Sequence, residues 1–468
     1  MIKVHNTLTG TKEEFIPLDK AGRNVNMYVC GITPYDEVHL GHGRCYVVFD
    51  VVRRYLKYRG YNVKYIQNFT DIDDKIIKRS NELKIPHTEL SRKFIDDYFT
   101  QMRKLNILDA DSYPLVTGTV EDIKKFIQKI IDNGYAYIID GDVYFSVRKF
   151  NGYGKLSKRN IEDLKSGARV GVDERKEDPL DFALWKKAKP GEPFWDSPWG
   201  KGRPGWHIEC SAMSLNEFGF DTFDIHGGGL DLVFPHHENE IAQSEAALGK
   251  GFVNYWLHNG FVTINKEKMS KSLGNFFTLR EIFEKYDPMT VRYFLVGQQY
   301  RSPLDFSDDK LEQAKNAWKR ILNAVEKSSE LIKILPSGEL SENVKKQAET
   351  FAKNFTEAMD DDFNTPVALA NIHFLVNNLF LFHKNPPAGL NKPDVQTFLS
   401  KLLEFCDILG LKIQNDTDIP AAVSLLSEKR HQARKEKNWQ LADDLRKEIE
   451  NLGYTIEDTG TGTKIKKK

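Results

Sequence analysis

Cysteine is scarce in this 468-residue chain, which contains only Cys30, Cys45, Cys210 and Cys406. Four cysteines scattered over so long a chain do not resemble the dense framework of a disulfide-rich secreted protein, so reduced thiols or metal ligation are expected. Long apolar runs are also lacking, because none reaches the ~18 residues that span a bilayer. The longest, residues 367–382, is interrupted by polar side chains and predicts a buried helix of a bundle rather than a membrane partner.

Neither sign of charge is in excess, because 67 Lys and Arg balance 67 Asp and Glu for a net charge of +0. This balance argues against a chain dominated by non-specific nucleic-acid binding, although it allows local basic patches. The first ten residues, MIKVHNTLTG, lack the apolar core of a signal peptide, which predicts a cytoplasmic protein. The chain has no P-loop motif, and Gly227–Gly229 does not fit a dinucleotide fingerprint, so P-loop and nicotinamide enzymes are disfavoured.

The fold class expected is α/β, followed by an all-α region. Residues 25–29 are an apolar run, 43–59 have a helical pattern, and 61–66 form a second strand pattern, which together predict a βαβ unit with parallel strands. From about 307 to 452 apolar residues recur at helical spacing. The expected divisions are a Rossmann-like catalytic domain in two halves (1–135 and 205–306), an insertion between them (136–204), a helical bundle region for RNA (307–452) and a small hairpin with a basic tail (453–468).

The first chemical motif is His39-Leu40-Gly41-His42, which follows a strand and loop and opens a helix. The unpaired N–H groups and the dipole at a helix start attract anions, and Gly41 lets a base or phosphate approach the backbone. The two imidazoles could donate to phosphate oxygens. The alternative is that His39 and His42 only cap the helix locally.

The second motif is Lys268-Met269-Ser270-Lys271-Ser272. Two lysines and two serines in five residues form a cationic loop that can stabilise charge developing on a phosphorus atom, usually the largest catalytic contribution. A solvated basic loop is the plain alternative. That alternative loses weight because the histidine motif stands upstream in the same chain.

A third set of residues has the donor types that zinc accepts. Cys30 ends the first predicted sheet strand, Cys210 lies in Gly-Trp-His-Ile-Glu-Cys, and His236 and Glu240 stand four residues apart on one helix face. His237 and Glu238 are expected to point elsewhere, and no second His completes a metalloprotease motif. The alternative is that the cysteines are small buried hydrophobes and that the helix face is merely charged. Cys45 and Cys406 have no other potential metal ligands beside them and are predicted to lie in the core.

The pairing of the histidine motif with the Lys-Met-Ser-Lys-Ser loop resembles the class I aminoacyl-tRNA synthetases. The resemblance implies that His39 and His42 contact the ATP phosphates and that Lys268 and Lys271 stabilise the adenylation transition state. ATP would be supplied with Mg²⁺. The remaining ATP-binding positions implied by the resemblance are Gly41, Gly228, Asp231, Val262 and Ser270.

The larger set of motifs is similar to the cysteinyl-tRNA synthetase family. These motifs are Cys-Gly-Ile-Thr at 30–33, Gly-Trp-His-Ile-Glu-Cys at 205–210, His-Gly-Gly-Gly at 226–229, Pro-His-His-Glu-Asn-Glu at 235–240 and the Thr-Asp-Ile-Asp-Asp run at 70–74. The resemblance implies one Zn²⁺ per chain, L-cysteine and ATP as substrates, tRNA(Cys) as partner and a monomer. Its implied zinc ligands are Cys30, Cys210, His236 and Glu240, and its implied substrate-binding residues are Trp206, His226 and Thr70.

Three alternatives stay open from the sequence. A cysteine ligase that uses an amino sugar as acceptor would share the adenylation motifs and the zinc set, but such relatives lack the full C-terminal region that this chain retains. A small nucleotidyltransferase has a similar histidine motif but is short and lacks the zinc set. A non-catalytic zinc-dependent RNA-binding protein would have no use for the lysines at 268–272.

Overall fold

A computed structural model describes residues 1–162, 175–219, 222–264, 267–268, 277–413, 421–459 and 462–467. The chain divides into two compact units, Met1–Leu411 and Lys412–Lys468. The division falls inside the range 307–452 that the sequence analysis treats as one helical region, between a helix that ends at Ile408 and the next, which begins at Ala421.

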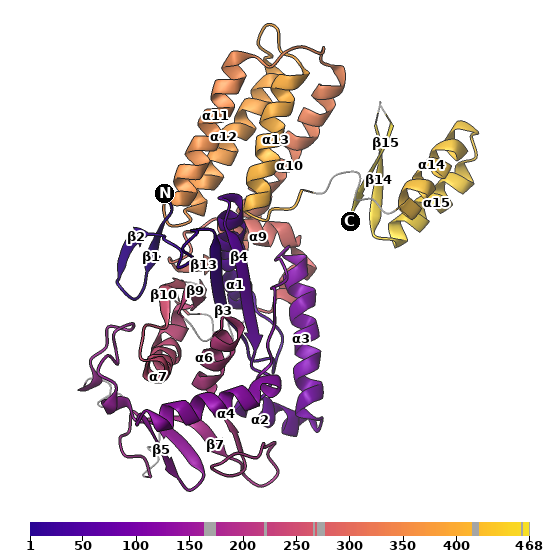
Figure 1. Cartoon of the computed structure of the whole chain (residues 1–468). Coiled ribbons are helices and arrows are strands. Elements are labelled where there is room, and N and C mark those ends of the chain that lie inside the picture. Colours follow the sequence, from indigo (N-terminus) through magenta and orange to yellow (C-terminus); the bar gives the residue numbers. More distant parts are fainter. Residues whose placement is uncertain are drawn as a thin grey trace. The chain divides into compact units, whose positions relative to one another are not determined.

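A parallel four-stranded sheet forms the centre of the first unit (Figure 1). Its strands are β3 (Asn24–Ile32), β4 (Asn62–Phe69), β9 (Phe223–Gly229) and β10 (Val253–Asn259), in the order β10-β9-β3-β4. Helix α1 (Leu40–Tyr58) connects β3 to β4, which confirms the predicted βαβ unit. The middle of β3 is apolar and buried, as strands covered on both faces are.

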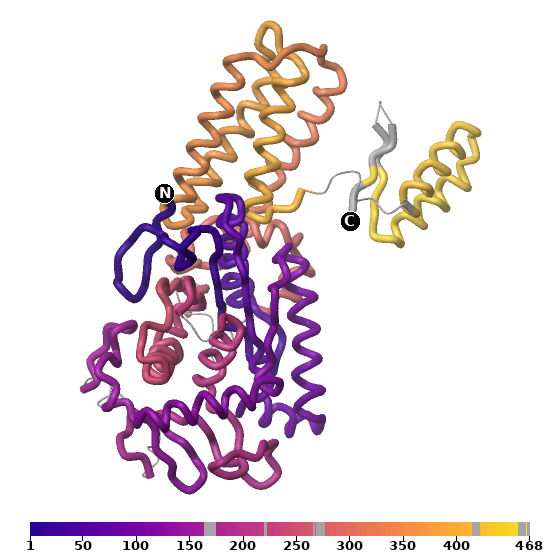
Figure 2. Tube along the Cα trace, in the orientation of Figure 1, coloured from indigo at the N-terminus to yellow at the C-terminus, as the bar shows by residue number. Residues whose placement is uncertain are grey.

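The strand order reverses between β3 and β9. The chain leaves β3 toward β4 on one side, and it returns much later to place β9 on the other side. Figure 2 shows the indigo segment of β3 beside the rose segment of β9, although nearly 200 residues separate them. In an open α/β sheet, the crevice beyond the carboxyl ends of such neighbouring strands is the usual ligand site.

An antiparallel sheet interrupts this domain within the predicted insertion. It consists of β5 (Ala136–Ile139), β6 (Asp142–Phe145), β7 (Phe182–Lys187) and β8 (Gly202–Pro204). The turn at Asp140-Gly141 joins β5 to β6 with both residues at positive φ, as the predicted hairpin requires.

The other elements of the first unit surround these two sheets. They are β1 (Lys3–Asn6), β2 (Thr11–Glu14), α2 (Asp74–Leu83), α3 (His87–Lys104), α4 (Val116–Asp132), the 3₁₀ turn η1 (Val147–Lys149), α6 (Trp206–Glu217), the 3₁₀ turn η2 (Leu230–Leu232), the π-helical turn η3 (Val233–His237), α7 (Glu238–Leu248), β11 (Val262–Ile264), β12 (Glu267–Lys268), α8 (Leu279–Lys285), α9 (Pro288–Val296) and β13 (Leu304–Phe306).

A helical bundle completes the first unit (Figure 1). Its helices are α10 (Asp308–Ile334), α11 (Glu342–Asp360), α12 (Thr365–Lys384) and α13 (Lys392–Ile408). Helix α12 is long and apolar enough to span a membrane by length and composition alone. It packs instead against α10, α11 and α13, which confirms the buried bundle helix expected from the sequence.

The second unit is small. It contains α14 (Ala421–Lys435), α15 (Trp439–Asn451) and the antiparallel hairpin β14 (Tyr454–Thr459) and β15 (Gly462–Lys467). Gly453, with φ 85°, stands between the last helix and the hairpin, as the predicted helix stop requires. The basic tail expected at the end is part of β15 rather than a separate extension.

Candidate active site and metal centre

The histidine motif forms the start of α1. His39 is its N-cap, and Nδ1 of His39 accepts hydrogen bonds from the backbone N–H of Gly41 (3.0 Å) and of His42 (3.3 Å). Nδ1 of His42 accepts in return from the backbone N–H of His39 at 3.3 Å. A neutral imidazole whose Nδ1 accepts carries its proton on Nε2. The capping alternative is therefore realised, and it also prepares each ring to donate from Nε2 to an anion.

The residues that flank the second motif on both sides are described. Lys268 pairs with Thr263 across β11 and β12. On the far side of the motif, the backbone N–H of Leu40 donates to the carbonyl of Phe277 at 3.2 Å. Ser270 and Lys271 lie outside the described residues, as does the side chain of Lys268. The structure therefore places the segment after the lysine motif against the histidine motif.

Four side chains from four different elements meet near the carboxyl end of β3. Cys30 belongs to β3, Cys210 to α6, His236 to η3 and Glu240 to α7, and all are buried. One ligand atom from each lies within 4.8 Å of the others. The sequence analysis grouped the same four residues, although Cys30 and Glu240 are 210 positions apart in the chain.

Two of the distances between these atoms match those expected around a tetrahedral zinc ion. Bonds of about 2.3 Å from zinc to sulfur place two sulfurs about 3.8 Å apart, and the Cys30 and Cys210 Sγ atoms are 3.8 Å apart. Cys30 Sγ is 3.7 Å from Glu240 Oε1, close to the roughly 3.6 Å expected between sulfur and oxygen ligands. His236 Nε2 is 3.0 Å from Glu240 Oε1, a hydrogen-bond distance.

The charges of the cluster also favour a bound cation. Burial opposes ionisation of Glu240, but His226 and His236 lower its pKa to about 2. Burial opposes protonation of His236, but Glu240 raises its pKa to about 10. A hydrogen bond from Cys30 lowers the pKa of Cys210 to about 6, whereas burial raises the pKa of Cys30. The lowered pKa values of Glu240 and Cys210 therefore give the cluster two anionic donors of the kinds that zinc accepts.

His237 corrects the sequence analysis, which expected it to point away from the cluster. Its Nε2 is 3.2 Å from Cys30 Sγ and 3.9 Å from Glu240 Oε1. The physical reason is that residues three and four positions before Glu240 both share its helix face. Cys30, His226, His237 and Glu240 form a second group of possible ligands, but that group contains a single sulfur.

The predicted substrate residues lie around the same cluster. The Trp206 ring, 40% exposed, stacks on His236 with centroids 4.4 Å apart. His226 is fully buried, and its Nε2 is 2.9 Å from Glu240 Oε2. Thr70 is buried one layer further away, where its hydroxyl donates to Glu209 at 2.8 Å. Trp206 alone of the three combines nearness to the cluster with solvent exposure.

The predicted nucleotide residues follow the carboxyl ends of β9 and β10. Gly228 is buried in β9, opposite His258 of β10. Asp231 is exposed in the turn η2 that follows β9. Val262 is buried in β11, which begins shortly after β10 ends. All three therefore lie near the sheet edge that the histidine motif also approaches.

Sequence reasoning assigned no role to three further residues of the site. His207 Nδ1 is 2.9 Å from His236 Nδ1, and His258 Nε2 is 2.8 Å from His237 Nδ1. Glu209 is fully buried beside Cys210, and burial raises its pKa well above the usual range. His207 and Glu209 belong to the Gly-Trp-His-Ile-Glu-Cys motif at 205–210. His258 is a residue of β10 that belongs to none of the sequence motifs.

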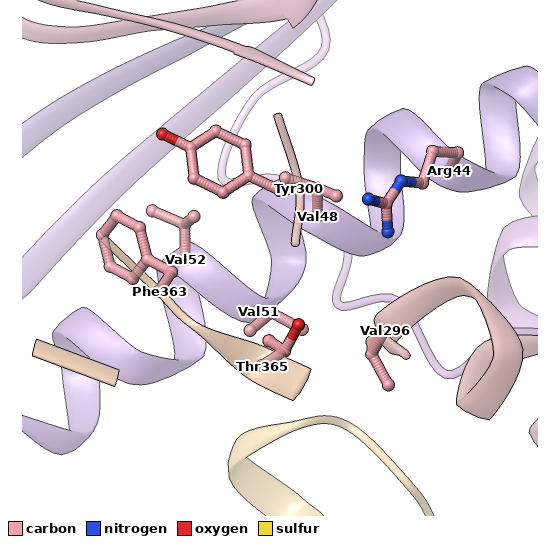
Figure 3. Close-up of a pocket in the computed structure, with 8 residues that line it drawn as sticks. All are labelled: Arg44, Val48, Val51, Val52, Val296, Tyr300, Phe363 and Thr365. Atoms are coloured by element: carbon pink, nitrogen blue, oxygen red, sulfur yellow. The ribbon is translucent and has the colours of Figure 1, made fainter. Parts of the chain in front are cut away.

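The two cysteines expected in the core differ in burial. Cys406 is buried in α13, which confirms that expectation, whereas Cys45 of α1 is only partly buried. A small apolar cavity lies beside α1, where Val52 lies near Phe363 and Val48 near Tyr300 (Figure 3). Arg44 at its edge donates to the carbonyls of Gln298 and Gln299. This cavity contains none of the residues predicted for the active site.

Comparison with protein families assigns all three parts of the chain. The model of the family "tRNA synthetases class I (C) catalytic domain" matches residues 17–316. A DALR domain matches residues 354–414, and "Cysteinyl-tRNA ligase anticodon binding domain" matches residues 416–465.

Full-length relatives agree with these matches. The cysteine–tRNA ligase of Caldicellulosiruptor saccharolyticus is 51% identical over 471 residues and is covered completely, as is this chain. The cysteine–tRNA ligase of Endomicrobium trichonymphae is 53% identical over 478 residues, with 99% of this chain and 98% of the relative covered. Methionyl-tRNA synthetase of Mycobacterium tuberculosis, solved with methionyl-adenylate, has a TM-score of 0.61 at 16% identity, covering 83% of this chain and 90% of that one, which shows a shared fold.

Proposed function

The chain belongs to the class I cysteinyl-tRNA synthetase family, and from this membership we propose that it is a ligase that activates L-cysteine with ATP and transfers it to the 3′ end of tRNA(Cys). The observation that carries the proposal is the convergence of Cys30, Cys210, His236 and Glu240 in one buried cluster.

In the first step the cysteine carboxylate attacks the α-phosphorus of ATP, with pyrophosphate as the leaving group. His39 and His42 donate from Nε2 to phosphate oxygens, which the hydrogen bonds at their Nδ1 atoms support. Lys268 and Lys271 stabilise the charge that develops on the phosphate, and Mg²⁺ accompanies the ATP. Positioning and charge stabilisation account for this chemistry, so no general base is required.

Gly41 and Ser270 contribute further to nucleotide binding, and Gly228, Asp231 and Val262 line the adenosine side. At Gly228 an added Cβ would lie 2.9 Å from both His237 and Leu232, so packing within the protein already requires glycine at this position.

Zinc is the metal that we propose for the four converging side chains. Cys30, Cys210, His236 and Glu240 would hold the ion, and its chemistry would favour the substrate sulfur as a thiolate over a serine hydroxyl. Packing alone distinguishes substrates that differ by one small group by only ~1–3 kcal/mol. The hydrogen bond from His226 orients Glu240 toward the metal, as outer partners of ligands do. Trp206 covers the substrate from its exposed position, and Thr70 holds Glu209 behind the pocket.

In the second step the cysteinyl group passes to a ribose hydroxyl of tRNA(Cys). The helical region and the C-terminal unit bind the transfer RNA in this proposal, consistent with their family matches. Trp439, 58% exposed at the start of α15, is offered to a base beside the basic residues of α14. We further propose that the protein acts as a monomer in the cytoplasm.

The test is cysteine-dependent exchange of labelled pyrophosphate into ATP, compared with serine, with and without a zinc chelator. With metal, cysteine should exceed serine by more than the roughly 200-fold that packing can supply. Chelation should remove most of the difference. An unchanged ratio after verified metal removal would contradict the zinc assignment, and absence of any cysteine-dependent exchange would contradict the function itself.

A charging assay separates the nearest alternative. An enzyme that transferred cysteine to an amino sugar would show the same exchange but would not load transfer RNA. The retained residues 307–452 and the match of residues 416–465 to an anticodon-binding domain favour transfer RNA as the acceptor.

A further inference from the structure

Tyr28 of β3 is a buried tyrosine whose hydroxyl has no hydrogen-bond partner. The residue is 0% exposed, and among the residues that the structure describes none donates to its hydroxyl or accepts from it. Buried tyrosine hydroxyls are normally bonded, because an unpaired polar atom in the interior costs free energy. A phenylalanine would fill the same space without that cost. A hydroxyl at this position is therefore explained only by an acceptor that the pairing within the described chain does not provide.

Tyr28 lies against the metal cluster from two directions. It stands two positions before Cys30 on β3, the spacing of one strand face, and both belong to the same core cluster as Cys210. In the parallel register of β3 with β9 it is opposite His226, and the two ring centroids are 5.3 Å apart. His226 in turn contacts Glu240. Tyr28 is therefore next to one proposed ligand along its strand and next to the partner of another across the sheet.

The charge around the Tyr28 hydroxyl comes from the cluster. Burial raises the pKa of this hydroxyl well above its usual range, and the nearby Cys210, Cys30 and Glu240 raise it further by repelling the ionised form. A hydroxyl that is held in its protonated form beside potential anions can donate a hydrogen bond to one of them. The Tyr28 hydroxyl is thus an unused donor close to the acceptors of the metal site.

Cys210 is the proposed ligand whose sulfur changes from donor to acceptor when it binds a metal. Its Sγ donates to Asn68 Oδ1 at 3.8 Å, because an amide oxygen only accepts. A sulfur bound to a metal is a thiolate, which cannot donate, so this hydrogen bond is lost. Cys30, whose Sγ is 3.8 Å away, gives up its own proton when it ligates the same ion. The Cys210 sulfur then needs a donor, and Tyr28 has one without a partner.

We propose that the Tyr28 hydroxyl donates a hydrogen bond to the sulfur of Cys210 when the cluster holds zinc, an inference that rests on the proposed function. Tyr28 is a positioning residue, because it acts on a ligand of the metal rather than on the substrate. Donation to a ligand fixes its orientation and withdraws electron density from it, as outer partners of metal ligands do. A metal that receives less density from its protein ligands attracts a substrate sulfur more strongly. Tyr28 therefore contributes to cysteine binding rather than to the chemical steps.

The test is Tyr28→Phe in the full chain, which keeps the ring and removes only the hydroxyl. Zinc affinity, measured by competition with a chromophoric chelator, should fall about 10-fold. In protein loaded with Co²⁺, the sulfur-to-cobalt charge-transfer band should move to longer wavelength, because the sulfur loses a bond that withdraws electron density. The thermal midpoint of the metal-free protein should not fall, since the hydroxyl has no bond to lose there. The KM for cysteine in pyrophosphate exchange should rise while kcat changes little.

The matched control is Tyr98→Phe, which removes the hydroxyl of another buried tyrosine. Tyr98 belongs to α3, and its hydroxyl accepts from Gln67 Nε2 at 2.6 Å. Loss of this bond leaves a buried amide N–H unpaired, so the thermal midpoint of the metal-free protein should fall by about 2–4 °C. Zinc affinity and the cobalt band should stay as in the unaltered protein, because Tyr98 belongs to neither group of possible ligands.

The two variants separate a role toward the metal from an ordinary role in the core. If Tyr28→Phe left the zinc affinity and the cobalt band unchanged, the Tyr28 proposal would fall while the proposed function stood. If the unaltered protein exchanged pyrophosphate with cysteine but gave no sulfur-to-cobalt band, the zinc assignment would fall and this inference with it. Absence of any cysteine-dependent exchange by the unaltered protein would overturn the proposed function itself.

Discussion

Replacing Asp50 by Asn should destabilise the catalytic unit more than almost any other single exchange of equal size. Asp50 lies in the middle of α1 and is buried, as is Arg292 of α9. Arg292 Nη2 donates to Asp50 Oδ2 at 2.5 Å, and Arg54 Nε donates to the same oxygen at 2.8 Å. Arg292 also donates to the carbonyls of Leu105 and Leu409, so this one side chain joins three parts of the chain.

The expected loss of stability follows from removing the Asp50 carboxylate, which leaves the Arg292 and Arg54 guanidiniums without their anion. Removal of one partner from a buried ion pair costs about 3–5 kcal/mol, and Asn keeps the size of Asp and one carbonyl acceptor, which places the cost near the lower end. For a unit larger than 250 residues, each kcal/mol moves the thermal midpoint by about 2 °C or less, so a decrease of about 5 °C is expected. Tryptophan fluorescence during heating measures it.

The pH dependence gives a second check. Burial alone would raise the pKa of Asp50, but Arg292 and Arg54 lower it below the usual value of 3.8. A carboxylate whose pKa is lowered in the folded state stabilises the protein above its unfolded pKa, and that stabilisation is lost as the pH falls through the folded pKa. The difference between Asp50→Asn and the unaltered protein should thus be constant from about pH 6 to 8 and shrink below about pH 4.

The control is Asp361→Asn, which removes an exposed ion pair with Lys12. An exposed pair contributes at most about 1 kcal/mol, so the midpoint should move little. A midpoint for Asp50→Asn within 1 °C of the control at pH 7, or a difference that persists unchanged at pH 3, would refute the account of a buried ion pair.

Three further predictions concern the site. Glu240→Gln should lower zinc affinity at least about 100-fold and raise the KM for cysteine, read by metal analysis and exchange kinetics; full zinc occupancy would contradict its role as a ligand. Lys271→Ala should slow pyrophosphate exchange about 10²–10³-fold while zinc stays bound, and an unchanged rate would count against it. Gly227→Ala should cost about 1–3 kcal/mol in unfolding experiments, because the new Cβ would lie 2.4 Å from the Phe49 ring; unaltered stability would show that β9 can shift.

The local features of the site could be predicted from the sequence because neighbouring residues determine them. His39 caps α1 and is followed at the third position by His42, a relation that any helix start imposes. The spacing of His236 and Glu240 brings their side chains together through one helical turn. The prediction for His237 was wrong because it considered only the four-residue spacing to Glu240. A three-residue spacing also brings two side chains onto one helix face.

Long-range placement could not be predicted from residue pattern alone. The sequence analysis treated residues 307–452 as one helical region, whereas the contacts divide the chain at residue 411. His258 comes to His237 only because β10 pairs with β9 in one register.

By itself, the sequence determined the chemical types of donor, the order of strands and helices, and the short-range geometry of the histidine motif, because bonds between near neighbours leave few conformations. Only the tertiary structure decided that Cys30 and Cys210 lie 3.8 Å apart, and that Asp50 meets Arg292 in the interior. The physical reason is that such distances depend on how the sheet and helices bury their apolar faces together, which involves the whole unit at once.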